Sequence, residues 1–171
     1  MIQWAGKLRG IVVDNADPQK LGRLKVFVPG VYGENQPAEN LPWAWPCFPS
    51  GGSDDCGFFK VPEIGACVWV ELQWTDGQPD PSYPVWTGVW VKAGATPEDV
   101  HGAAADAHYY TVVKNAAGGG TLVLCDKPGA EFAKIRHKTG AMIVIDAQGN
   151  IILHPAAGAK IKGLKSYPEV K

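Results

Sequence analysis

Acidic side chains are the first residues in this sequence that could do chemistry. Asp54-Asp55, Asp76, Asp80 and Glu98-Asp99 supply carboxylates which, in suitable pairs, act as acid and base in the cleavage of glycosidic bonds. Each lies in a stretch rich in polar residues, glycine or proline, where solvated loop acids are the rule. No serine lies in a Gly-x-Ser-x-Gly motif, so a nucleophilic serine is not indicated either. The sequence therefore predicts a protein that is not an enzyme.

Motifs for phosphate, metal or cofactor binding are not found in the sequence. Gly118-Gly119-Gly120-Thr121 lacks the lysine of a phosphate loop and indicates a turn. His137 and His154 could bind an ion on a symmetry axis, although packing or solvent contact explains them more simply. We predict no cofactor and no metal. The cysteines form neither a CxxC pair nor a Cys/His cluster with zinc spacing: Cys47, Cys56, Cys67 and Cys125.

The cysteines are expected to be reduced. Cys67 and Cys125 lie inside apolar, strand-like runs, where a free cysteine acts as a small hydrophobic residue. Cys47 and Cys56 flank a loop and could approach each other across it, so their pairing stays open. The start, Met1 to Trp4, lacks the pattern of a signal peptide, which predicts synthesis in the cytoplasm, where disulfides are uncommon.

The composition predicts a packed, all-β protein. The 171 residues are 46% hydrophobic and 19% charged, with 21 Gly and 14 Pro, and no long stretch has helical spacing. The longest apolar run, 141–145, is far below the ~20 residues of a membrane helix, so no stable membrane insertion is expected.

The first half, 1–92, is predicted to be a small closed barrel. Apolar runs at 7–13, 22–28, 66–74 and 83–91 alternate with turn residues, and closure would remove exposed strand edges. In the second run, Leu24, Val26 and Val28 share one face. The proline-rich segment 34–49 is interpreted as a long excursion from the barrel.

The tryptophans of this half could stack the bases of a single-stranded nucleic acid, which also requires a cationic groove. Arg9, Arg23 and Lys25 form the basic cluster near these strands, and Asp14 and Asp17 offset it. The net charge of −1 argues against a nucleic-acid coat protein. Core packing or protein contact is the preferred role, and a single-strand nucleic-acid-binding barrel is the alternative. The tryptophans concerned are Trp43, Trp45, Trp69, Trp74, Trp86 and Trp90.

The second half contains short strands separated by glycines. After a linker at 93–108, in which 97–99 could begin a helical turn, the sequence predicts a shaft at 109–163 and a tail at 164–171. The similar pieces 138–146 and 149–154 indicate a repeating β unit, as in a solenoid. The predicted strands are 110–114, 121–125, 132–137, 141–145, 151–154 and 160–162.

About 60 residues in narrow strands cannot enclose a core alone, because so small a unit buries too little surface to offset its chain entropy. We therefore predict that three identical chains intertwine around a shared axis. The alternative is an ordinary hairpin meander lying on the barrel. The residues expected to pack at the trimer axis are Leu122, Leu124, Ile135, Ile143, Ile145, Ile151 and Leu153.

An ordered set of short motifs carries a family resemblance. It runs from Gly10 through the Asp17-Pro18 turn and Gly22-Arg23 to Pro29-Gly30, and ends at Pro84-Val85-Trp86-Thr87-Gly88. Between them come Trp43-Ala44-Trp45-Pro46, Gly57-Phe58 and Pro62-Glu63-Ile64-Gly65. This half resembles the barrel of the central spike proteins of contractile phage tails, the baseplate assembly protein V type. It is also similar to the valine-glycine-repeat spikes of type VI secretion. The barrel-signature residues are Gly10, Asp17, Pro18, Gly22, Arg23, Pro29, Gly65, Trp86 and Gly88.

The resemblance implies an all-β protein in which an OB-fold barrel is followed by a short intertwined triple-stranded β-helix, which forms a trimeric prism. It implies a structural role in a virion tail baseplate or an equivalent injection particle. The barrel would attach to hub proteins at the end of the tail tube, and the shaft would help to pierce the host envelope. The linker leaves no room for the lysozyme domain of some relatives, and no His-x-His pair forms an iron-binding tip. A blunt shaft could be capped by a separate tip protein.

Overall fold

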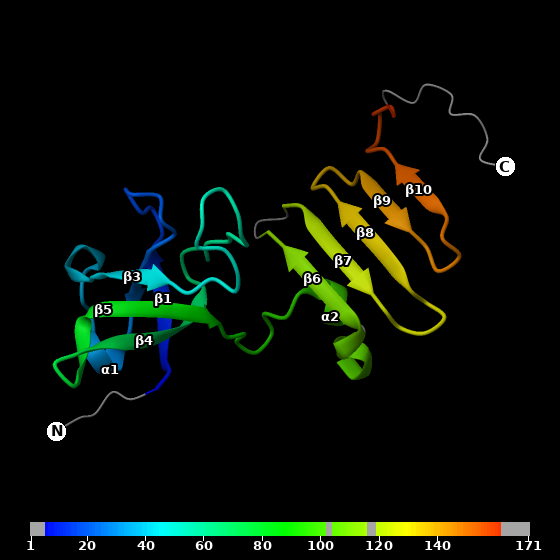
Figure 1. Cartoon of the computed structure of the whole chain (residues 1–171). Coiled ribbons are helices and arrows are strands. Elements are labelled where there is room, and N and C mark those ends of the chain that lie inside the picture. The colour runs from blue at the N-terminus through cyan, green and yellow to red at the C-terminus, as the bar shows by residue number, and fades with distance from the viewer. Residues whose placement is uncertain (1–5, 102–103, 116–118, 162–171) are drawn as a thin grey trace. The chain divides into compact units, whose positions relative to one another are not determined.

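The computed structural model describes residues 6–101, 104–115 and 119–161, which form two compact units that divide between Ala93 and Gly94. Both units are built on β-strands (Figure 1). Within these residues, no helix is long and apolar enough to cross a membrane. The predicted tail, 164–171, and the last two residues of the predicted shaft lie outside the described residues.

The strands of the first unit close into a barrel in the order β1-β2-β3-β5-β4. Neighbouring strands are antiparallel except β3 and β5, which are parallel and place Trp45 opposite Val85. The prediction of a closed N-terminal barrel is therefore confirmed. Its strands are β1 (Leu8–Asp14), β2 (Leu24–Phe27), β3 (Trp43–Pro46), β4 (Cys67–Thr75) and β5 (Gln78–Val89).

Alternating side chains of these strands fill the barrel. Leu24, Val26 and Val28 are almost fully buried, as the period-two pattern predicted, and Arg23, Lys25 and Phe27 between them are partly exposed. Apolar residues from the other strands complete the core: Val12, Ala44, Val68, Val70 and Trp86.

The interpretation of 34–49 as an excursion is wrong for its second part, which holds η1 (Ala38–Asn40) and β3. Ala44 is fully buried in the core, and β3 pairs with both β2 and β5, so it is needed for closure. The prolines suggested a loop, but Pro42 precedes the strand and Pro46 ends it, where the missing N–H costs little.

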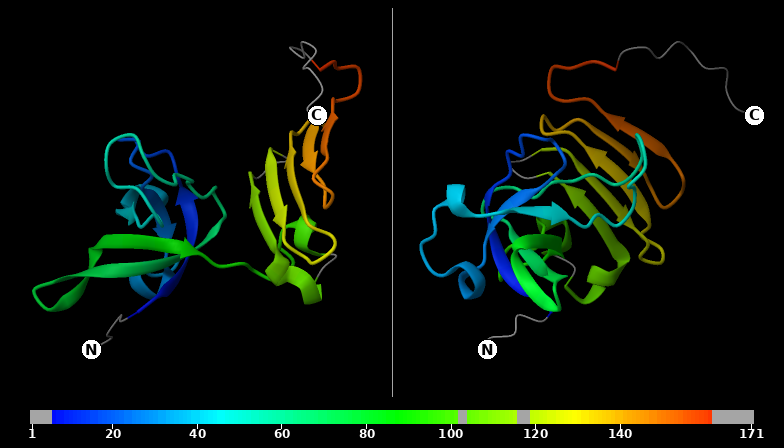
Figure 2. Two further views of the ribbon diagram at one scale, coloured as in Figure 1. Left: turned by 45° about the vertical axis from the view of Figure 1, so that its right-hand side comes forward. Right: turned by 60° about the vertical axis from the view of Figure 1, so that its left-hand side comes forward.

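The hairpin of β4 and β5 is longer than predicted, because β5 begins at Gln78 and not near Tyr83. Thr75 pairs with Gln78 across Asp76 and Gly77, whose φ values of 52° and 77° are those of a two-residue turn that suits a twisted hairpin. The hairpin projects beyond the rest of the barrel (Figure 2). Tyr32, at the end of α1 (Pro29–Tyr32), donates its hydroxyl to the Pro81 carbonyl at 2.8 Å.

The second unit is one antiparallel sheet in which each strand pairs with the next along the chain (Figures 1 and 2). The sequence placed these five strands to within one residue at either end. Lys160 and Ile161, which begin the sixth predicted strand, are not in a strand, and Lys162 lies outside the described residues. The strands are β6 (Tyr110–Lys114), β7 (Thr121–Cys125), β8 (Phe132–Arg136), β9 (Met142–Ile145) and β10 (Ile151–His154).

The structure has a single-chain meander where the sequence predicted interleaved chains. In the single chain, both edges of β7, β8 and β9 are paired with strands of the same chain, and the intertwining of chains stays a prediction. The connections between successive strands span only five or six residues, a length that favours hairpins between neighbours over long crossings. Among the described strands, β6 and β10 each keep one edge without a strand partner.

The interval predicted as a linker, 93–108, contains helical structure. It holds α2 (Glu98–His101) and most of η2 (Ala104–Tyr109), and the expected helical turn does begin after Pro97. Asp99 of α2 contacts Lys134 of β8 at 3.4 Å and Lys114 of β6 at 3.9 Å. Most of the interval therefore belongs to the second unit and covers part of one face of its sheet.

Candidate functional site: the barrel signature and the open face of the second sheet

Asp17 organises the turn that joins β1 to β2. Its side chain is only 3% exposed, and its carboxylate accepts the backbone N–H groups of Gln19 at 3.0 Å and Leu21 at 2.8 Å. The N–H of Arg23 is bonded to the same carboxylate at 3.3 Å. Backbone donors in a turn have no ladder partner, so one carboxylate satisfies several of them at once.

Arg23 joins this turn to β3. Its guanidinium contacts the Asp17 carboxylate through Nη2 at 2.7 Å and through Nε at 3.2 Å. These hydrogen bonds hold the pKa of Asp17 well below its usual range, with the backbone donors adding to the effect. The guanidinium also lies 5.6 Å and 5.4 Å from the ring centroids of Trp43 and Trp45. Arg23 is thus fixed in place by the fold.

Gly22 and Trp86 connect the same turn to β5. The buried indole of Trp86 donates Nε1–H to the Gly22 carbonyl at 3.1 Å, which links residues 64 positions apart. Gly22 has a φ of 77°, and a Cβ there would lie 3.0 Å from the Phe48 ring. The Phe48 ring packs edge-on against Trp86, with the ring centroids 5.3 Å apart. Only glycine fits this position without strain.

Three further signature residues, Gly10, Gly65 and Pro29, also serve the barrel itself. Gly10 is buried in β1, where an added Cβ would overlap Val26 and lie 3.2 Å from Val28. Gly65, with a φ of 84°, donates its N–H to Val12 at 2.8 Å. Pro29 occupies the first turn of α1, where a missing N–H costs nothing. The signature therefore marks the closure and turns of the barrel.

The acids considered for catalysis lie in turns, in an exposed loop or beside cations of the second sheet. Asp76 forms the β4–β5 turn, and Asp80 accepts the Ser82 N–H at 2.8 Å. Asp54 and Asp55 are exposed in a loop. Asp99 is surrounded by cations of the second sheet. These contacts give each of the partnered acids a role in the fold.

The described residues hold no group of three or more His, Cys, Asp or Glu side chains placed to bind a metal. Cys67 and Cys125 are buried, as the sequence predicted, and Cys47 and Cys56 are exposed free thiols. His137 Nδ1 lies 2.9 Å from the Thr139 hydroxyl, a local contact at the end of β8.

Cations of the barrel surface already lie against its tryptophans. The Arg9 guanidinium is 4.9 Å from the Trp90 ring centroid and 5.8 Å from that of Trp69, and Lys25 Nζ is 5.3 Å from Trp43. A stacked base would have to displace these contacts. For Trp43, Trp69 and Trp90 the arrangement favours packing or protein contact over base stacking. Trp74 is 58% exposed at the end of β4.

The second sheet has an apolar face made of two rows of side chains, which we call the open face. The strand register places the members of each row side by side across the five strands. Row 1 consists of Val113, Leu122, Ile135, Ile143 and Leu153. Row 2 consists of Thr111, Leu124, Ala133, Ile145 and Ile151.

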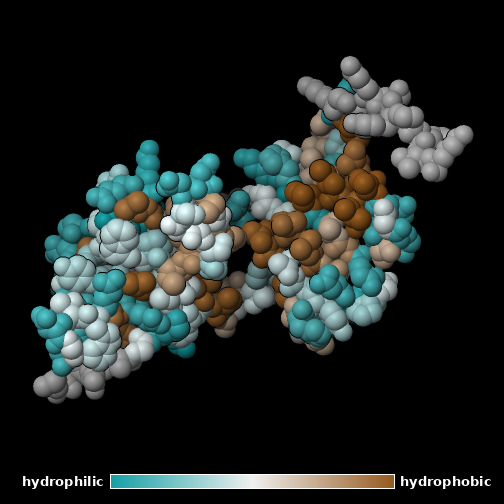
Figure 3. Space-filling view, viewed as in Figure 1, coloured by the Kyte–Doolittle hydropathy of each residue, from teal (hydrophilic) through white to brown (hydrophobic). Residues whose placement is uncertain are grey.

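The large side chains of the open face are exposed, from 36% at Leu122 to 70% at Ile151. Figure 3 shows the resulting continuous hydrophobic area over the strands of this unit. All seven residues predicted to pack at a trimer axis lie on this face, and that role stays a prediction. Val113, Thr111 and Ala133 also lie on this face and were not predicted there, although each is two residues from a predicted member or from another open-face residue of its strand.

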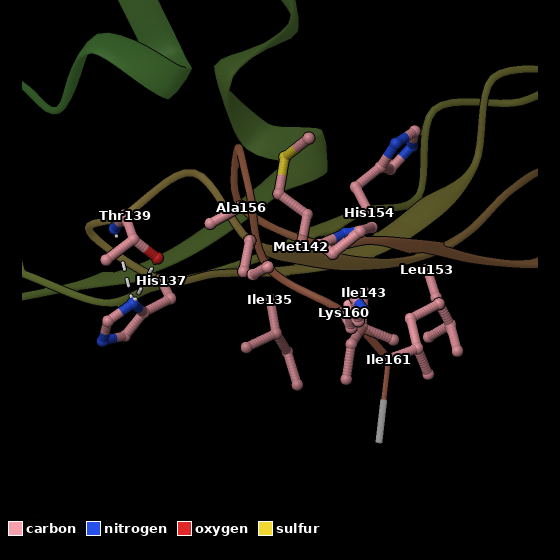
Figure 4. Close-up of a pocket in the computed structure, with 13 residues that line it drawn as sticks. Ile135, His137, Thr139, Met142, Ile143, Leu153, His154, Ala156, Lys160 and Ile161 are labelled. Carbon is pink, nitrogen blue, oxygen red and sulfur yellow. Dashed lines mark hydrogen bonds between the residues drawn. The ribbon is translucent and has the colours of Figure 1, made fainter. Parts of the chain in front are cut away.

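The opposite face of the sheet is covered over β7 and β8, whereas Ile152 of β10 is exposed on it. Thr121, Val123 and Cys125 are buried there, and Asp99 contacts cations on the same side. In Figure 4, Ile135, Ile143 and Leu153 point to one side of the sheet, whereas Met142 and His154 point to the other. Within the chain the unit therefore buries a small core on one face of the sheet, and the larger set of apolar side chains, on the other face, remains exposed.

Comparison with known proteins agrees with the geometry of the barrel. A search of curated proteins finds no match to the chain. Residues 8–90 match the family described as the type VI secretion system/phage-baseplate injector OB domain. These residues comprise all the barrel strands and all the signature residues. The first unit is thus a closed five-stranded barrel that matches this injector OB domain, and the match supports a structural role in a baseplate.

Proposed function

We propose that the chain forms the trimeric central spike of a contractile-tail baseplate or an equivalent injection particle. The barrel attaches to hub proteins at the end of the tail tube, and the second sheet forms a shaft that helps to pierce the host envelope. The family match supports the baseplate role, and the structural character of that family favours a role without catalysis.

The open face carries the trimer proposal. Fully burying one exposed Leu or Ile side chain contributes about 1.5–3 kcal/mol, and the large side chains of both rows are still 36–70% exposed, so an interface on this face would add substantial stabilisation. Exposed apolar patches of such extent mark interfaces. Because the match ends at residue 90, this face lies entirely outside the matched domain.

A threefold arrangement suits the dimensions of the sheet. Strands of four or five residues rise ~3.3 Å per residue, so each sheet forms a wall roughly 15 Å wide. Three such walls, each with two inward apolar rows, enclose a triangular interior that side chains can fill. In this arrangement each chain supplies one wall, and the chains need not interleave.

Such a prism can bear an axial load. The strands lie across the axis, so compression acts along a stack of inter-strand hydrogen bonds around a dry apolar interior. Five strands at ~4.8 Å spacing give a stack of only about 20 Å between the outermost strands. A shaft this short, with the outer edge of β10 at one end, suits capping by a separate tip protein.

Sedimentation equilibrium of the full chain tests the proposal. We expect three chains at micromolar concentration. Ile143→Asp places a charge on the open face and should give monomers. The matched control is Ile152→Asp, an exposed isoleucine on the neighbouring strand and the opposite face, which should remain trimeric. A monomeric parent protein, or equal behaviour of the two variants, would overturn the trimer.

A further inference from the structure

Row 2 of the open face has a gap at its middle strand. Ala133 lies between Leu124 and Ile145, and its methyl group leaves a depression between two long side chains. An open hollow of ≈ 480 Å³ lies at this end of the strands, lined by these three residues, by Cys125 and Phe132 at the strand ends, and by the adjoining loops. This notch is wide enough to receive a side chain from outside.

Row 1 has a projection on the same strand. Ile135 is 55% exposed, more than its row neighbours Leu122 and Ile143, which are 36% and 47% exposed. It stands between two further hollows and lines both of them. In Figure 4 its side chain extends freely from the sheet beside Ile143 and Leu153.

The projecting Ile135 side chain, which we call the knob, and the Ala133 notch lie at the same height along the stack of strands. Both belong to β8, the middle strand, and their side chains are two residues apart on one face. Copies related by rotation about an axis parallel to the stack place β8 at the same height. Such a rotation brings row 1 of one copy against row 2 of the next, so Ile135 of each chain faces Ala133 of its neighbour.

The two flanks of the sheet carry opposite charge. The loops 137–141 and 155–161, on the row 1 side, contain Lys138 and Lys160 and no acid, which gives +2. The loops 126–131 and 146–150, on the row 2 side, contain Asp126, Glu131 and Asp146 against Lys127, which gives −2. Lys127 is itself bonded to Asp106 at 2.6 Å. A head-to-tail contact joins a basic flank to an acidic one, whereas a contact between like flanks would be repulsive.

We propose that second and third copies of this chain dock head-to-tail on the open face, with Ile135 of each chain seated in the Ala133 notch of the next. The contact sets the register between chains, because a shift by one strand would place Ile135 against Leu124 or Ile145. This inference rests on the proposed trimer and specifies how its chains meet.

Disulfide trapping tests the contact. In the full chain with Cys47→Ser and Cys56→Ser, the pair Ala133→Cys and Ile135→Cys should give a covalent trimer on a non-reducing gel. Within one chain these positions lie two residues apart with parallel Cβ vectors, so they cannot bridge each other. Each single cysteine variant should give no covalent trimer, because the two positions meet only each other.

The register control combines Ala133→Cys with Leu153→Cys, a row 1 position two strands away. The offset of roughly 10 Å exceeds the reach of a disulfide, so this pair should trap at least tenfold less trimer. Trapping by Ile135→Cys alone, or equal trapping by the control pair, would overturn the notch even if the parent protein sediments as a trimer. A monomeric parent would instead overturn the proposed function.

Volume compensation gives a second measurement that does not depend on thiols. Ala133→Leu fills the notch and should raise the chain concentration needed for half assembly. Adding Ile135→Ala removes the clashing knob and should lower that concentration again by about tenfold. If Ile135→Ala worsens assembly of the Ala133→Leu variant as much as it does that of the parent, the two side chains do not meet and the proposal is wrong.

Discussion

At the scale of single residues, the barrel depends on a few contacts that connect distant parts of the chain. Asp17 satisfies the turn after β1, Arg23 carries that turn to Trp43 and Trp45, and Trp86 bonds it to β5. These contacts explain why an ordered set of short motifs identifies the domain. Each motif supplies one half of an interaction whose other half is elsewhere in the sequence.

Asp17→Asn should destabilise the barrel at neutral pH and matter less in acid. The folded state holds the pKa of Asp17 below its usual range, so between that lowered pKa and about 3.8 the unfolded state binds more protons. The stabilisation is complete above about pH 5 and falls as the pH drops. All seven tryptophans precede residue 93, so tryptophan fluorescence during urea unfolding reports on this unit alone.

The control for this prediction is Asp54→Asn, an exposed loop carboxylate, which should change barrel stability little at any pH. A difference between Asp17→Asn and the parent that stays constant from pH 7 to pH 3 would contradict the linkage argument.

Gly10→Ala should destabilise the barrel by about 1–3 kcal/mol, because the new methyl group overlaps Val26 in a filled core. Gly30→Ala is the matched control, since an added Cβ there meets nothing within 4 Å and alanine suits a helical turn. Urea midpoints followed by tryptophan fluorescence compare the two variants. Equal urea midpoints of the two variants would contradict this prediction, because the core around β1 would then accommodate the added methyl group without loss of stability.

At the scale of elements, other parts of the chain cover one face of the second sheet over β7 and β8 and leave the other face exposed. The segment of α2 and η2 covers the face that holds Val123, and Asp99 places one carboxylate among Lys114, Lys134 and Arg136 at 3.4–3.9 Å. The element predicted as a linker is therefore attached to the sheet, which leaves the open face as the side available to other chains.

Asp99→Asn should loosen this cover, because it leaves three neighbouring cations without their shared carboxylate. Since those cations are partly exposed, we expect a loss of about 1–2 kcal/mol. Hydrogen exchange of the β6 and β8 amides should accelerate, while that of the barrel stays unchanged. Glu98→Gln, at the exposed neighbouring position, is the control and should exchange like the parent. Equal exchange in the two variants would contradict the role of Asp99.

At the scale of the whole molecule, the chain consists of two units with separate interiors. The boundary lies at Ala93 and Gly94, and residues 91–96 are exposed. The first unit contains a closed core of its own. The second unit has one partly covered face and one open face, and in the proposed spike the open face is buried against identical chains.

Trypsin cleavage after Lys92 should leave the barrel folded. Lys92 is exposed at the unit boundary, and no barrel strand extends beyond Val89. After cleavage, the urea midpoint of tryptophan fluorescence should match that of the intact chain. A large fall in the midpoint would show that the barrel depends on the second unit.

Much of this protein could be predicted from local sequence patterns. Alternation at Leu24, Val26 and Val28 identified a core strand, and glycine-punctuated apolar pairs placed β6 to β10, because both signals depend only on neighbours along the chain. Where one strand carries two axis candidates they lie two residues apart, and this spacing puts both on the same face of that strand. The pairing register then brings the candidates of the different strands onto one face of the sheet. The barrel motifs likewise indicated the domain that residues 8–90 match.

Tertiary structure decided what depends on residues far apart in the chain. β3 becomes a strand because β2 and β5 supply its hydrogen bonds, despite prolines that locally favour a loop. Asp99 acquires its cations only when α2 folds back on β6 and β8, and Ala133 becomes a notch only between Leu124 and Ile145 of neighbouring strands. The register within the chain likewise decides which residues lie side by side across β6 to β10. Periodicity along a sequence specifies which way a side chain points, whereas its neighbours across a sheet are set by pairing.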